Sequence, residues 1–169
     1  GPAAVPPLLS WRQEIRFAVG LLTRLPLRRD LSEGEWPEGA AVRALPIVGA
    51  GIGAVGAASY ALCDAIGLGA SISSLMAIGA MALLTGGAPE AGLAETADSL
   101  ARGHSTDERL ALMGDGQVGA PGILALMLVV LLRVEALALA GSAAAAGLLL
   151  VAAAGSSRAA RVLGMQRTA

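Results

Sequence analysis

Four long apolar runs constrain this chain more than any other feature of its sequence. They cover about residues 42–62, 67–85, 119–140 and 143–163. Each approaches the ~20 residues that an α-helix needs to cross the hydrocarbon core of a bilayer. Soluble helices of this length carry a charged face, and these runs mostly do not. The pattern therefore predicts an all-α fold, a polytopic membrane helix bundle with about four transmembrane helices.

The apolar runs consist mainly of small and aliphatic residues. The chain is 55% hydrophobic but only 2% aromatic, it contains 23 glycines, and its mean hydropathy is +0.68. Small residues allow helices in a bilayer to pack closely. The run Gly49-Ala-Gly51-Ile-Gly53-Ala-Val-Gly56 also resembles part of a dinucleotide-binding loop, but no strand precedes it. Close helix packing is the better interpretation of these glycines.

The first 41 residues differ from the rest and form the first of two predicted units. A proline-containing leader, residues 1–10, precedes apolar residues at helical spacing: Trp11, Ile15, Ala18, Val19 and Leu22. This spacing predicts an amphipathic helix that lies either in the headgroup layer or against other parts of the protein, and Pro26 ends it. The second unit, residues 42–169, is the membrane domain, with an acidic loop at 86–118.

Arginine placement predicts the orientation of the four spans. With four spans, eleven of the twelve arginines fall on one side of the membrane, and the two hairpin turns near Asp64 and Ser142 contain none. Basic residues are enriched in cytoplasmic segments. Both termini and the loop 86–118 are therefore predicted to be cytoplasmic.

The twelfth arginine, Arg133, lies within an apolar run, close to Glu135. Residues two apart on a helix do not face each other, and a charge within the membrane costs at least roughly 2.5 to 3.5 kcal/mol on insertion scales. Each side chain therefore needs a partner elsewhere or a wet cavity. Two alternatives follow for Arg133, which are an interhelical clamp and a role in a substrate cavity.

The polar segment between the second and third runs is the predicted site of chemistry. Residues 85–119 hold six of the thirteen acidic residues, and carboxylates need water or a lined cavity. Pro89 is a good first-turn residue for a new helix, on which Glu95 and Asp98 share a face with Arg102 one turn beyond. The alternative is a solvated acidic loop with an Asp98–Arg102 pair. His104 is the only histidine, so a zinc site is not expected.

Asp115 is the third carboxylate of interest, and it lies between two glycines. Such a turn is adaptable, and its backbone amides can approach an anion. Carboxylates that converge on one point suit Mg²⁺, which binds proteins through few carboxylates together with substrate phosphates. The net charge of −1 gives no reason to expect a nucleic-acid partner.

Four blocks of the chain together resemble the cobalamin synthase family, the adenosylcobinamide-GDP ribazoletransferases. Their order and spacing match the family, and Thr85-Gly-Gly precedes the third block. The blocks are Leu21-Leu-Thr-Arg-Leu-Pro26, Leu45-Pro-Ile-Val-Gly49, Gly92-Leu-Ala-Glu-Thr-Ala-Asp98 and Arg109-Leu-Ala-Leu-Met-Gly-Asp115. The resemblance covers nearly the whole chain from about Arg16.

The resemblance implies an enzyme of the bacterial inner membrane. Members join α-ribazole or its phosphate to adenosylcobinamide-GDP with release of GMP, and they use Mg²⁺. The implied partners are this corrinoid nucleotide, α-ribazole and the lipid bilayer. The implied roles are catalytic for Asp98 and Asp115, metal-binding for Glu95, Asp98 and Asp115, and substrate-binding for Arg24, Arg102 and Arg109.

The chain also departs from the family pattern. The family loop typically reads Gly-Gly-Leu-His-x-Asp-Gly-Leu-Ala-Asp-Thr-Ala-Asp-Gly, and a typical member continues into further membrane helices. Here Pro89 stands at the histidine, Ala91 at the first aspartate and Glu95 at the second, while Asp98 is kept. Near Asp115, the substituted positions of the pattern are Gly114, Gly116 and Gln117. These departures define the alternative, a catalytically degenerate relative that serves as a structural subunit or scaffold with other membrane proteins.

Overall fold

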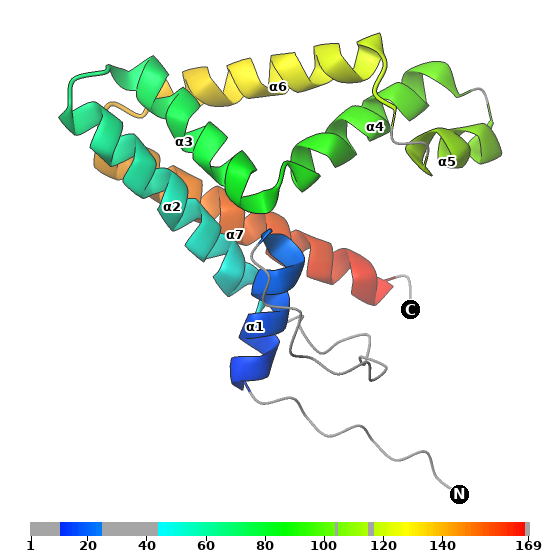
Figure 1. Cartoon of the computed structure of the whole chain (residues 1–169), viewed down its shortest axis with the longest axis horizontal. Helices are drawn as coiled ribbons and strands as arrows, with labels where there is room; N and C mark the ends of the chain where they lie inside the picture. The colour runs from blue at the N-terminus through cyan, green and yellow to red at the C-terminus, as the bar shows by residue number, and fades with distance from the viewer. Residues whose placement is uncertain (1–10, 25–43, 104, 115–116, 168–169) are drawn as a thin grey trace, which may run out of the picture.

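The fold is all-helical in the part of the chain that the structure describes. This computed structural model describes residues 11–24, 44–103, 105–114 and 117–167 (Figure 1). The predicted unit boundary at residue 41 lies outside these ranges. The helices are α1 (Trp11–Leu22), α2 (Leu45–Ala65), α3 (Ala70–Thr85), α4 (Ala88–Arg102), α5 (Thr106–Gly114), α6 (Ala120–Ala138) and α7 (Ala143–Arg167). The predicted fold class is confirmed.

Helices α2 and α7 pack side by side in opposite directions (Figure 1). Glycines make this contact possible, because a Cβ at Gly49 would lie 2.6 Å from the Ala154 carbonyl oxygen and one at Gly53 would lie 2.6 Å from that of Leu150. From the other side, a Cβ at Gly147 would lie 3.2 Å from that of Ala57. The interpretation of the glycine run as a close packing surface is therefore confirmed.

Helix α1 packs on protein, which was one of the two alternatives for its apolar face. Ala18 is fully buried in a cluster with residues from the first two turns of α2, and Ile15, Val19 and Leu22 pack around that cluster. Just beyond the helix, the Arg24 amide donates a hydrogen bond of 3.1 Å to the Leu84 carbonyl near the end of α3. The amino-terminal helix is thereby attached to both α2 and α3.

A sharp break separates α3 from α4. Gly86 and Gly87 both adopt the left-handed conformation, with φ of 69° and 71°, and the Gly87 amide donates to the Ala82 carbonyl at 2.8 Å. Helices commonly end with a glycine in this conformation, and Pro89 then suits the first turn of the next helix. The two helix axes differ by 92°. The second apolar run is therefore part of a bent unit.

The predicted number of four spans is not confirmed. By length and composition, α2 with 21 residues and α6 with 19 residues could each cross a membrane, and the bent pair α3–α4 could be a third, broken span or a re-entrant loop. In α7, the apolar part is the shorter stretch Ala143–Arg158. The chain is thus a helical membrane protein, with two or three candidate spans among the residues that the structure describes.

Helices α3, α4 and α6 form three sides of a triangle in Figure 1. Helix α6 runs from the far end of α4 to the beginning of α3, where a core cluster fixes it. The cluster consists of Tyr60, Ala77, Ile78, Val134, Leu137, Ala146 and Leu150. Only 11% of the most apolar stretch of α6 is buried, so most of this helix is available to lipid. The same helix brings its amino end to the polar residues of α4.

Candidate functional site

Asp98 joins α4 to the amino end of α6. The residue is 2% exposed, Oδ1 accepts a hydrogen bond of 2.8 Å from the Gly122 amide, and Oδ2 accepts one from the Gly119 amide. The first amides of a helix have no partner within the helix, and a negative charge is favourable there. Asp98 therefore caps α6 from a neighbouring helix. The alternative of a solvated acidic loop does not hold for this residue.

Two glycines allow α6 to approach Asp98. A Cβ at Gly122 would lie 2.5 Å from the Ala94 carbonyl oxygen and 2.8 Å from Oδ2 of Asp98. One at Gly119 would lie 3.1 Å from Oδ1 of Asp98 and 3.1 Å from Nη1 of Arg102. Arg102 is exposed, and its guanidinium thus lies beside Gly119 on the same side as the Asp98 carboxylate. We call this contact between α4 and the amino end of α6 the α4–α6 junction; it consists of Ala94, Asp98, Arg102, Gly119 and Gly122.

The other predicted substrate arginines lie elsewhere. Arg24 lies at the break between α3 and α4, where its Nε and side-chain carbons surround the position of a Cβ on Gly86. Arg109, on α5, donates from Nε to the Gly103 carbonyl at 3.0 Å and so satisfies the carboxyl end of α4. Arg24 and Arg102 are at opposite ends of a helix of 15 residues, about 22 Å long at 1.5 Å per residue. The structure does not bring the three arginines to one point.

The predicted metal ligands are only partly described. Glu95 is half-buried one turn before Asp98, and Asp115 lies outside the described residues. Within the described ranges, no three or more His, Cys, Asp or Glu side chains are grouped to hold a metal. Each Asp98 oxygen keeps a lone pair, but the carboxylate is enclosed and already bound to backbone amides, which suits Mg²⁺ and its waters poorly. The convergence of Asp98 with Asp115, and the Mg²⁺ site itself, stay predictions.

Arg133 has its partner on another helix. Its Nη1 lies 3.6 Å from Oε1 of Glu90 in the first turn of α4. This ion pair is the interhelical clamp, one of the two alternatives for Arg133. Glu135 is exposed on the same helix. Glu90 was not among the sequence-based candidates, because its only local signal is that of an acid near a helix start, which is common.

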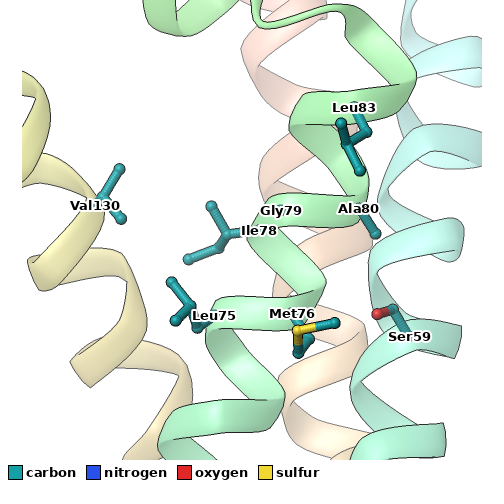
Figure 2. Close-up of a pocket in the computed structure, with 8 residues that line it drawn as sticks. All are labelled: Ser59, Leu75, Met76, Ile78, Gly79, Ala80, Leu83 and Val130. Atoms are coloured by element: carbon teal, nitrogen blue, oxygen red, sulfur yellow. The ribbon is translucent and has the colours of Figure 1, made fainter.

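An apolar pocket with a volume of about 480 Å³ is lined mainly by residues of α3 (Figure 2). Leu75 and Ile78 face Val130 of α6, while Ser59 of α2 lies on the opposite side of α3. The other lining residues are Met76, Gly79, Ala80 and Leu83. None of these groups is charged, so the pocket is unsuited to a diphosphate. Among the described residues, the polar candidates for chemistry are at the α4–α6 junction.

These features define a helical membrane protein whose polar junction residues lie on a bent helix pair and at the amino end of a candidate spanning helix. The chain belongs to the CobS family, described as cobalamin-5-phosphate synthase, whose family model matches residues 14–169. The resemblance of the four sequence blocks is thereby confirmed. No solved structure matches the chain.

Several similar proteins carry the name adenosylcobinamide-GDP ribazoletransferase. The one from Bradyrhizobium diazoefficiens is 35% identical over 125 residues, covering 74% of this chain and 48% of the relative. The one from Xanthobacter autotrophicus is 41% identical over 132 residues, covering 74% and 49%. The one from Ralstonia pickettii is 34% identical over 151 residues, covering 89% and 59%. The chain thus spans about half the length of the curated relatives it matches.

Proposed function

We propose that the chain takes part in the transfer of α-ribazole, or its phosphate, to adenosylcobinamide-GDP, with release of GMP. The observation that carries the proposal is the family match over residues 14–169, together with relatives named for this transfer. In the reaction, a ribazole hydroxyl attacks the phosphorus attached to the cobinamide, the bond between the two phosphates breaks, and the hydroxyl proton leaves with a base. The alternative of a structural subunit has no comparable support.

In this proposal the α4–α6 junction binds the diphosphate side of the substrate. Asp98 fixes the amino end of α6, and Arg102, beside Gly119, offers a guanidinium to phosphate oxygens. Glu95 and Asp115 are the residues proposed to hold Mg²⁺ with the substrate phosphates. When bound, the metal would neutralise charge on the diphosphate and stabilise the leaving phosphate.

The proposed location is the bacterial inner membrane, with both termini and the segment 86–118 in the cytoplasm. Support comes from the distribution of the arginines, eleven of which fall on one side if the chain has four spans. This side is also where a soluble nucleotide substrate and released GMP would be found. Other protein subunits remain outside the proposal.

The proposal is tested by GMP release from purified protein in detergent or lipid with Mg²⁺, adenosylcobinamide-GDP and α-ribazole. Omission of α-ribazole should abolish release, and Glu95→Gln should lower it by an order of magnitude or more, since ~1.4 kcal/mol of transition-state stabilisation is tenfold in rate. Glu135→Gln is the matched control on a remote exposed carboxylate. Absence of GMP release with all components present would contradict the transferase proposal and favour the structural subunit.

A further inference from the structure

The Glu90–Arg133 ion pair connects two helices that also meet at the α4–α6 junction. Nη1 of Arg133 and Oε1 of Glu90 are 3.6 Å apart, which is longer than a typical hydrogen bond. The Arg133 side chain is 53% exposed and that of Glu90 is 21% exposed. The contact is therefore a charge pair at the edge of the interface, between a candidate span and the bent unit.

Each charge of this pair would be costly without its partner. The second oxygen of Glu90, Oε2, is buried and has no hydrogen-bond partner in the described part of the chain. Arg133 extends from a helix whose only other charged residue is Glu135. An unpaired charge in such surroundings is costly, whereas a paired one costs less.

The pair and the junction hold α4 at two separated points. Glu90 is eight residues before Asp98 on the same helix, so the two contacts are about 12 Å apart along its axis. Before Glu90, the chain passes through Gly86 and Gly87, which connect α3 to α4 and both adopt the left-handed conformation. One contact alone would leave α4 able to pivot about it, because glycines allow more backbone conformations than other residues do. Two contacts fix its direction.

We propose that Glu90 and Arg133 are positioning residues that set the direction of α4 against α6 and thereby hold the α4–α6 junction in its working geometry. Neither residue touches Asp98 or the glycines of the junction in the hydrogen bonds and ion pairs of the described chain. Their effect on the junction is therefore through the rigid helix between them. The catalytic part of this inference rests on the proposed function, and the structural part does not.

The structural part is tested by hydrogen exchange of a peptide that contains the Gly119 and Gly122 amides, measured by mass spectrometry on the full chain. In Glu90→Gln and in Arg133→Gln, exchange of this peptide should become faster by about tenfold or more, because the junction opens more often. The double variant should resemble either single variant, since loss of one partner already breaks the pair. Arg133→Lys keeps the charge and should restore much of the protection.

Glu135→Gln is the matched control, because it removes a charge from the same helix two residues from Arg133. It should leave the exchange of this peptide unchanged. Unchanged exchange in both single variants, effects that multiply in the double variant, or an equal effect of Glu135→Gln would each overturn the inference.

Enzyme kinetics test the catalytic part. If the pair positions the junction, the single variants should lower kcat by about tenfold while KM changes much less, and Arg133→Lys should recover kcat. An unchanged kcat in an active protein would overturn the positioning role in catalysis. If the unaltered chain releases no GMP, the proposed function fails, while the exchange measurement still decides whether the pair fixes the junction.

Discussion

Asp98 is the residue at which the structure makes its strongest quantitative prediction. Its carboxylate accepts two backbone hydrogen bonds, from Gly119 and Gly122, in a site that is 2% exposed. Hydrogen bonds to charged groups contribute about 1.5 to 3 kcal/mol each. Asp98→Asn keeps the shape, but its amide has one acceptor oxygen and a donor group that would face the second backbone amide. The expected loss is about 3 kcal/mol, with roughly 0.3 to 1 kcal/mol of it from the helix dipole.

Thermal unfolding in a mild detergent measures this loss. For a chain of this size, 1 kcal/mol shifts the midpoint by about 2 to 4 °C, so Asp98→Asn should lower it by about 6 to 12 °C without added Mg²⁺. The matched control is Glu95→Gln, on the same helix and half-buried, for which no comparable backbone contact is described. Its midpoint should stay close to that of the unaltered chain, although its GMP release should fall.

The two variants together separate a structural carboxylate from a metal ligand. If Asp98→Asn unfolds at the same midpoint as the unaltered chain and loses only Mg²⁺-dependent activity, the capping argument is refuted. In that case Asp98 would act chiefly as a ligand, and the two amides of α6 would have to find other acceptors. An equal fall in both midpoints would instead indicate that the loss of any carboxylate from α4 destabilises the fold.

The glycine contacts, the arginine distribution and the apolar runs each lead to a further expected result. Gly53→Val should disrupt the α2–α7 contact at a cost of at least about 1 to 3 kcal/mol, seen as a lower unfolding midpoint. Gly51→Ala should not, because no atom outside the neighbouring backbone of α2 lies within 4 Å of its Cβ position. On a cysteine-free background, an impermeant reagent added outside should label cysteines placed at Asp64 or Ser142 and spare one at Ser105; the reverse pattern would refute the orientation. The chain should also require detergent to stay monodisperse, and dispersal in plain buffer would exclude a membrane setting.

Local sequence patterns predicted local features well. The repeated glycines at 49–56 predicted close packing, and Pro89 predicted the start of a new helix. Both signals lie in the backbone preferences of a few adjacent residues. The partner of the glycine run, α7, and the 92° bend depend on the packing of distant segments. For the same reason the run at 67–85 gave no sign that its helix would be too short for a single straight span.

The partners of the charged residues were the least predictable part of the fold. The pattern around Arg133 required a partner but could not identify Glu90, because many acids were available and nothing local selects one. Glu95 and Asp98 were expected on one helix face with Arg102, and the structure places all three on α4. The assignment of Glu95 and Asp98 to a metal depended on the resemblance and on Asp115, which lies outside the described residues.

The cap on α6 shows why Asp98 and the distant glycines form one structural unit. Gly119 at the start of α6 has no side chain that could accept a hydrogen bond, and Pro121 in the first turn has no amide hydrogen. The free amides of such a helix start need an acceptor from elsewhere, because hydrocarbon provides none. Asp98 provides it, and the absence of side chains at Gly119 and Gly122 lets the carboxylate reach them. A change at either end therefore affects the same contact, so the Gly122→Ala and Asp98→Asn variants should weaken it by less together than the sum of their separate effects.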